Sequence, residues 1–113
     1  MKQKLTILIT ILILSTLSVT AIANSQDLKV HFIDVGQGDC TLLELPNKQI
    51  MLIDAGNNDD GPMIANYIKG LGIKKIDYLI GTHPHADHIG GLDDIIYRFQ
   101  INNIYLPNVT HTS

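Results

Sequence analysis

Three histidines and one aspartate fall within six residues of this sequence, at His83, His85, Asp87 and His88. Extended backbone places side chains two residues apart on the same side, so the imidazoles of His83 and His85 could reach one ion. Asp87 and His88 follow where the chain is expected to turn into a helix, so they could reach a second position nearby. Imidazole and carboxylate together suit zinc, and also manganese or iron. Two such ions, about 3.5–4 Å apart, could activate water and polarise a scissile ester or phosphoryl group.

A purely structural interpretation of the same stretch is available. Asp87 could cap the N-terminus of the following helix, and the histidines could be clustered by chance. Capping involves only Asp87 and leaves three histidines at this spacing unexplained, so the metal site is favoured. Gly90 and Gly91 have no side chains that would keep the first helical turn away from the site.

The flanking sequence predicts the elements that would position this cluster. Apolar and polar residues alternate over 28–32, which is typical of a half-buried strand, and Pro46-Asn47-Lys48 separates two apolar runs as in a hairpin. In chain order we expect strands over 28–32, 40–45 and 49–54, a helix beginning at Pro62, a strand over 76–82, a helix over 92–99 and a strand over 103–106. The expected apolar stripes of the two helices are Ile64, Tyr67, Ile68 and Leu71, and Leu92, Ile95, Ile96 and Phe99. This order predicts an α/β layered domain in which helices cover at least one face of a sheet.

At these residues the chain resembles the metallo-β-lactamase superfamily, whose hallmark is His-x-His-x-Asp-His at a strand-to-helix junction. Residues 31–39, HFIDVGQGD, resemble the opening of one branch, the hydrolase domain of the ComEC/Rec2 competence proteins and their free-standing secreted relatives. Residues 52–56, LIDAG, are similar to the first motif of the superfamily. The resemblance extends from Leu28 to the last residue.

The resemblance implies an αββα sandwich that binds two divalent metals between its sheets, zinc foremost and manganese as the alternative. By the same resemblance, His83 and His85 would be ligands of the first metal, and Asp87 and His88 of the second. Asp87 would also be the catalytic residue that transfers a proton. Asp54 would support the site from behind the ligands by hydrogen bonds that orient their loop.

The resemblance also implies more chain than this sequence contains. A bridging aspartate and a further histidine of the family have no counterpart before Ser113, and His111 is interpreted as a loop histidine. We therefore expect residues 24–113 to be a truncated N-terminal half of the hydrolase domain, with little or no activity. Half a sandwich should also leave one apolar sheet face without its partner sheet.

The N-terminus predicts an export signal. Lys2 and Lys4 precede an apolar stretch over 5–14, and Ala21-Ile22-Ala23 is typical of signal-peptidase cleavage before Asn24. Residues 1–23 are therefore expected to be a signal peptide, with a retained membrane anchor as the alternative. Either interpretation predicts a secreted or extracytoplasmic protein, and cleavage would leave it without a stable membrane partner.

The charge of the chain argues against binding nucleic acid through a basic surface, and its single cysteine argues against disulfide or thiol chemistry. The net charge of −3 becomes −5 once Lys2 and Lys4 are removed, with six basic and eleven acidic residues remaining. No basic run extends beyond Lys74 and Lys75, so the sequence does not predict a cationic surface for nucleic acid. Cys40 is the only cysteine, which excludes an intramolecular disulfide, and it is interpreted as a small buried hydrophobe rather than a reactive thiol.

Several weaker candidates have ordinary explanations. His31 is interpreted as a strand residue, and Asp34 and Asp39 as turn residues, with a position lining the site as the alternative for both aspartates. Residues 57–60, NNDD, are expected to form a solvated loop at the mouth of the site rather than a calcium site.

Three functions follow from these predictions. The first is an exported metal-dependent phosphodiesterase acting on DNA or on a wall-polymer phosphoester, with nucleic acid as a possible partner. The second is a hydrolase of another ester, a thioester or a lactam, because the ligand motif is shared across those chemistries. The third is a truncated chain that binds metal weakly, or not at all, and does no catalysis.

Overall fold

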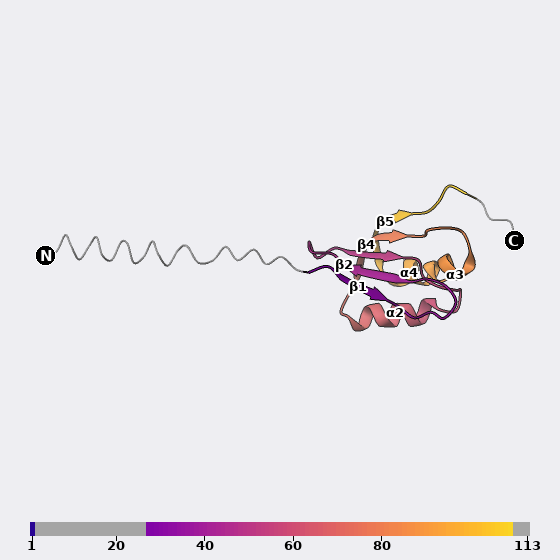
Figure 1. Ribbon diagram of the computed structural model, residues 1–113, viewed down its shortest axis with the longest axis horizontal. Coiled ribbons are helices and arrows are strands. Elements are labelled where there is room, and N and C mark those ends of the chain that lie inside the picture. Colours follow the sequence, from indigo (N-terminus) through magenta and orange to yellow (C-terminus); the bar gives the residue numbers. More distant parts are fainter. Residues whose placement is uncertain (2–26, 110–113) are drawn as a thin grey trace.

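The computed structural model describes Met1 and residues 27–109 (Figure 1). The predicted signal peptide, after Met1, and His111 lie outside the described residues. The elements are β1 (Lys29–Phe32), β2 (Thr41–Glu44), β3 (Ile50–Ile53), α2 (Gly61–Gly70), β4 (Lys75–Ile80), α3 (Ala86–Ile89), α4 (Leu92–Arg98) and β5 (Gln100–Tyr105). The predicted mixed α/β class is confirmed. Among the described residues, no helix has the length and apolar character needed to cross a membrane.

The five strands form one sheet in the order β1-β2-β3-β4-β5. Neighbouring strands are antiparallel from β1 to β3 and parallel from β3 to β5. The parallel connections need crossovers, which are supplied by α2 and by the α3–α4 segment. The carboxyl ends of β3, β4 and β5 therefore meet at one edge of the sheet, which places the loops after β3 and β4 side by side.

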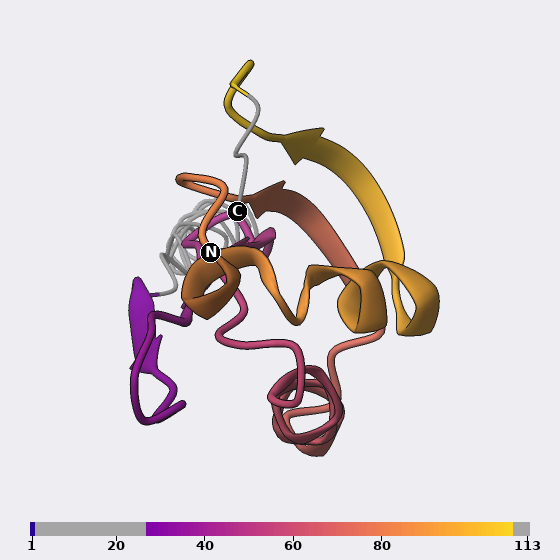
Figure 2. The same cartoon turned by 90° about the vertical axis from the view of Figure 1, so that its right-hand side faces the viewer.

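Helices α2 and α4 pack on the same face of the sheet (Figure 2). Leu42, Leu52 and Leu79 align across three neighbouring strands and are fully buried. They belong to one core cluster with Ile68 of α2 and Ile95 of α4. Full burial of such a side chain stabilises the fold by about 1.5–3 kcal/mol. This core fixes the sheet edge from which the loops with the histidines extend.

The opposite sheet face carries exposed apolar side chains. Phe32, Ile80 and Tyr105 lie in one row of paired residues, next to the buried row that contains Leu42. Phe32 is 84% exposed and Tyr105 is 54% exposed, whereas Ile80 is half-buried. An uncovered apolar sheet face was expected, and this face has that character.

The helical stripes are narrower than the sequence predicts. Tyr67 and Leu71 of the expected α2 stripe are exposed, and so is Ile96 of α4. Ala65 instead joins Ile64 and Ile68 in the buried face of α2. Phe99 is not helical but has extended backbone (φ −126°, ψ 152°), and β5 begins directly after it, three residues earlier than predicted. Its ring remains buried, which explains why helical spacing alone could not separate the two conformations.

Candidate metal centre

The predicted ligands lie together at the carboxyl ends of β3 and β4. His83 and His85 are in the loop that follows β4, and Asp87 and His88 are in the short helix α3. Asp54 directly follows β3. Ligand atoms of His83, His85 and Asp87 lie within 4.8 Å of one another, and the same holds for His83, His88 and Asp54. His83 belongs to both groups and joins them into one cluster.

Ring geometry agrees with this convergence. The ring centroids of His83 and His85 are 4.9 Å apart at an interplanar angle of 82°. The ring of His83 is 3.8 Å from that of His88, measured between centroids. Asp87 reaches the same group, because its Oδ2 lies 3.9 Å from Nε2 of His88. The structure thus brings all four predicted ligands together, while their role as ligands stays a prediction.

Asp54 is buried beneath the cluster and is hydrogen-bonded to two of its neighbours, Thr82 and His88. Its carboxylate accepts hydrogen bonds from the Thr82 amide at 2.8 Å, from the Thr82 hydroxyl at 2.6 Å and from Nδ1 of His88 at 3.0 Å. The residue is only 3% exposed, and its backbone has φ 59°, a left-handed conformation that aspartate tolerates better than most residues. These three bonds leave little capacity for a metal, so Asp54 is better suited to orienting the ligand loop than to ligating.

The hydrogen-bond network assigns the tautomers of two histidines. The Thr82 hydroxyl has one proton, and the Asp54 carboxylate can only accept it. The hydroxyl oxygen must then accept from Nδ1 of His83, which lies 2.9 Å away. His88 likewise donates its Nδ1 proton to Asp54. Both imidazoles therefore carry their lone pair on Nε2, the form in which histidine binds a metal while its other nitrogen is held by a carboxylate or hydroxyl.

Backbone contacts fix α3 against two other loops. The Asp39 amide donates to the Asp87 carbonyl at 3.2 Å, and the Ala55 amide donates to the His88 carbonyl at 2.7 Å. Gly38 has φ 134°, and a side chain there would collide with the Asp87 carbonyl. Gly90 is packed in the same way against the backbone of the loop after β3. Gly90 and Gly91 were expected to let the first helical turn approach the metal site. Both are closely packed, but against the backbone at Asn57 and Asn58 for Gly90 and at Ala55 and Gly61 for Gly91.

Three predictions about individual residues can be compared with the structure. Asp87 does not cap α3: the helix has His85 at its N-cap, and Asp87 lies within the first turn. Asp34 accepts from the Gly36 amide at 3.0 Å, as expected of a turn residue. Asp39 lies at the cluster, with its Oδ2 3.5 Å from Nδ1 of His88, so its alternative position lining the site is the better description.

Thr82 also belongs to the site, although the sequence did not predict it. Its amide and hydroxyl link the buried Asp54 to the His83 ring. The only signal was its place directly before the first histidine, where a hydroxyl can bond to a neighbouring side chain.

Other candidates lie outside the cluster or are inert. His31 bonds to Tyr67 at 2.9 Å and to Glu44 at 3.0 Å, so it joins β1 and β2 to α2, as a strand residue would. Cys40 is buried, which raises the pKa of its thiol to about 12, with smaller contributions from the negative charges of Asp54 and Asp60. Its interpretation as a buried, unreactive residue agrees with this environment.

Comparison with curated proteins finds two bacterial relatives. The chain is 27% identical to ComE operon protein 3 of Bacillus subtilis over 100 residues, which covers 74% of this chain and 13% of the relative. It is 39% identical over 51 residues to the Anti-Pycsar protein Apyc1 of Saccharibacillus brassicae, covering 45% of this chain and 19% of that protein. The chain thus spans less than one fifth of the length of either relative. The first match agrees with the predicted ComEC-like branch.

Solved structures of metallo-beta-lactamases share the fold. A mutant enzyme from Cronobacter sakazakii aligns with a TM-score of 0.55 and 30% identity over 62% of this chain and 28% of that chain. The enzyme MEM-A1 from a soil metagenome aligns with a TM-score of 0.52 and 26% identity over 68% of this chain and 29% of that chain. The described fold therefore corresponds to part of the metallo-beta-lactamase fold.

The family model described as "Metallo-beta-lactamase superfamily" matches residues 33–112. This range contains Asp54, Thr82 and all four predicted ligands, so it includes the whole cluster described above. The chain belongs to the metallo-beta-lactamase superfamily.

Proposed function

We propose that this chain carries the first metal-binding motif of an exported, metal-dependent phosphodiesterase. The observation that supports this most is the convergence of His83, His85 and Asp87, whose ligand atoms lie within 4.8 Å of one another. The donor set also fits: imidazole nitrogens and a carboxylate are common ligands of zinc. His83 and His85 would hold a first ion, and Asp87 and His88 a second.

The residues around the ligands would serve this chemistry in distinct ways. When bound, two divalent ions would supply an activated water and polarise the scissile bond. Asp54 and Thr82 hold the rings of His83 and His88 so that Nε2 carries the lone pair. The Asp87 carboxylate, which is half-buried, would carry a proton between water and the leaving group. A hollow of about 450 Å³ is lined by His85, the one predicted ligand among its lining residues, together with Asn58 and Asp93.

The phosphodiester is favoured among the possible substrates by the similarity to ComE operon protein 3 and by the opening residues 31–39. A second candidate, hydrolysis of a lactam or of another ester or thioester, is favoured by the likeness to the metallo-beta-lactamase from Cronobacter sakazakii.

The ligand count favours low activity for the 113-residue chain itself. Four ligands divided over two ions give two each, whereas a stable zinc site typically has about three or four protein ligands. We therefore expect weak metal binding and little turnover from this chain alone. Weak binding without any catalysis is the third candidate.

The test is a parallel assay of the zinc- or manganese-loaded protein on bis(4-nitrophenyl) phosphate, a thioester and a β-lactam. It should be run on this chain and on any longer polypeptide from the same reading frame, each with a His85→Ala control. Hydrolysis of the phosphodiester that is lost in the control supports the proposal. Hydrolysis of only the thioester or the lactam would refute the substrate class, and rapid metal-dependent turnover by the 113-residue chain would refute its expected inactivity.

Export forms a separate part of the proposal. It rests on Lys2, Lys4 and the Ala21-Ile22-Ala23 stretch. N-terminal sequencing of protein recovered outside the cytoplasm should begin at Asn24. Protein that retains Met1 and stays in the cytoplasm would contradict it.

A further inference from the structure

Basic side chains gather at the end of the molecule opposite the histidine cluster. They are Lys48 in the β2–β3 turn, Lys69 near the end of α2, Lys74 and Lys75 at the start of β4, and Arg98 at the end of α4. All five are exposed. They are five of the six basic residues within 27–109. We call this group the basic end.

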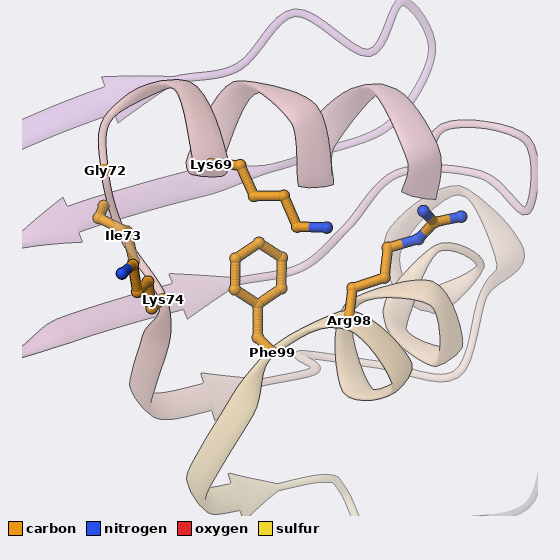
Figure 3. Close-up of a pocket in the computed structure, with 6 residues that line it drawn as sticks. All are labelled: Lys69, Gly72, Ile73, Lys74, Arg98 and Phe99. Atoms are coloured by element: carbon orange, nitrogen blue, oxygen red, sulfur yellow. The ribbon is translucent and has the colours of Figure 1, made fainter.

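Two neighbouring hollows shape the basic end. The smaller, of about 300 Å³, is lined by Lys69, Lys74, Arg98 and the buried Phe99, and Figure 3 shows Lys69 lying over the Phe99 ring. The larger, of about 520 Å³, has Lys48, Lys74, Lys75 and Asp77 as its charged lining residues. The hollows share residues 72–74, so Lys74 stands on the rim between them.

Most of this positive charge is not neutralised within the chain. Lys75 pairs with Asp77 at 2.8 Å, and Arg98 pairs with Asp94 at 2.9 Å. Lys69 contacts the face of the Phe99 ring, with 5.7 Å between Nζ and the ring centroid. Lys48 and Lys74 form no ion pair with any residue in the part of the chain that the structure describes. Five positive and two negative groups leave a local net charge of +3.

The charge distribution separates the two ends of the molecule. Strand β4 runs from Lys75 toward Thr82 at the histidine cluster, a path of about 20 Å at roughly 3.3 Å per residue. At the same end of the sheet as Lys75, Lys29 and Glu44 pair with each other at 3.7 Å. Seven of the eleven acidic residues lie toward the histidine cluster, where residues 27–109 contain no basic residue: Asp34, Asp39, Asp54, Asp59, Asp60, Asp87 and Asp93. A polyanion would therefore be attracted first to the basic end, because most of the remaining surface repels it.

We propose that the basic end docks the phosphate backbone of a nucleic-acid strand, at a site separate from the metal centre. Lysines spread over two adjoining hollows suit a ligand with repeated negative charges better than a single small anion, which needs converging donors. A bilayer surface fits less well, because the apolar lining residues Ile73 and Phe99 are not exposed for insertion. This docking goes beyond the proposed hydrolysis and does not depend on it. The basic end could not be predicted from the sequence because its five residues are scattered between positions 48 and 98.

The test measures binding without catalysis. Fluorescence anisotropy of a labelled single-stranded oligonucleotide is followed over a salt series, using the complete chain in EDTA and again after metal loading. Lys48→Gln and Lys74→Gln are the test variants, since neither side chain has an ion pair to lose. Lys29→Gln is the control, because Lys29 is already paired with Glu44 and lies on the edge strand β1, three strands away from β4. Circular dichroism confirms that each variant is folded.

Binding should weaken with salt, and each test variant should reduce the slope of log K against log salt by about 0.7. The Lys29→Gln control should leave the slope unchanged. Absence of binding, or an equal reduction by Lys29→Gln, would overturn the proposal. Lysine-dependent binding to phosphatidylglycerol vesicles without binding to the oligonucleotide would also overturn it. Because EDTA removes the metals, failure here is distinguishable from failure of the hydrolase proposal.

Discussion

Replacing Asp54 by asparagine tests how the hydrogen-bond network prepares the histidines. Asparagine has nearly the same shape and also tolerates the left-handed backbone found at this position (φ 59°). One carboxylate oxygen becomes an NH2 group, which donates and cannot accept. If the NH2 group takes the position of Oδ2, the bonds from the Thr82 hydroxyl and from Nδ1 of His88 must be lost or reversed. If it takes the position of Oδ1, the Thr82 amide loses its acceptor.

The structure allows the size of the effect to be estimated. If the amide donates to Nδ1 of His88, the ring must carry its proton on Nε2, and the lone pair intended for the metal is lost. Loss of such a supporting partner typically lowers metal affinity by about 10–100-fold. Losing one or two hydrogen bonds to a buried charge should also lower the free energy of unfolding by roughly 2–4 kcal/mol.

Asp77→Asn provides a matched control. Asp77 is also a buried carboxylate, and it accepts from the Ile50 amide at 2.9 Å and from Asn102 at 2.9 Å, but at the opposite end of β4. Zinc affinity is measured by competition with a chromophoric chelator, and stability by urea denaturation. Both variants should lose stability, and only Asp54→Asn should lose zinc affinity. Unchanged affinity in Asp54→Asn, or an equal loss in Asp77→Asn, would show that Asp54 does not prepare the histidines for metal.

Four further predictions concern three residues, Cys40, Gly38 and Asp77. Burial raises the pKa of the Cys40 thiol to about 12. The thiol should therefore react with a disulfide reagent at pH 8 only in denaturant. Rapid reaction of the folded protein would contradict the burial of this thiol. The same shift should lower stability as pH rises from about 9 to about 12, since the unfolded chain loses its thiol proton first, and Cys40→Ser should remove that dependence in alkaline urea titrations. Gly38→Ala should displace the Asp87 carbonyl, which would weaken metal binding and lower the free energy of unfolding by about 1–3 kcal/mol. Wild-type metal affinity and wild-type stability in this variant would show that the close contact between Gly38 and Asp87 is unimportant. Hydrogen bonds from Lys75 and from the Ile50 amide hold the pKa of Asp77 below its usual value. The free energy of unfolding should therefore decrease as pH falls below about 3.8. This decrease should be smaller in the Asp77→Asn variant.

The sequence predicted the fold class and the order of the main elements because both depend on local patterns. Alternation identified β1, and Pro62 identified the start of α2, where it lies in the first turn. The burial of individual side chains was harder to predict, because it depends on residues that are distant in the sequence. Tyr67 matched the helical stripe but is exposed, with its hydroxyl bonded to His31. Phe99 matched helical spacing but is extended, because spacing does not record backbone conformation.

In the candidate site too, the features that depend on local sequence could be predicted, and those that depend on tertiary contacts could not. The motif from His83 to His88 is contiguous, so its spacing alone predicted that the four side chains converge. The link from Asp54 to Thr82 joins residues 28 positions apart, and only the pairing of β3 with β4 brings them together. Asp39 reaches His88 for a similar reason, through the contact between its own amide and the Asp87 carbonyl. The basic end depends still more on tertiary structure, since its residues come from four separate segments.

Anomalous diffraction from crystals of the zinc-loaded protein would show whether His83, His85, Asp87 and His88 hold metal. We expect a zinc peak about 2.0–2.1 Å from Nε2 of His83, with His85 as a further ligand. Any second ion should be bound by Asp87 and by Nε2 of His88, and the first peak should be lost in His85→Ala. A zinc ion bound elsewhere in the chain, or bound through Nδ1 of His83 with the Thr82 contact broken, would contradict this expectation.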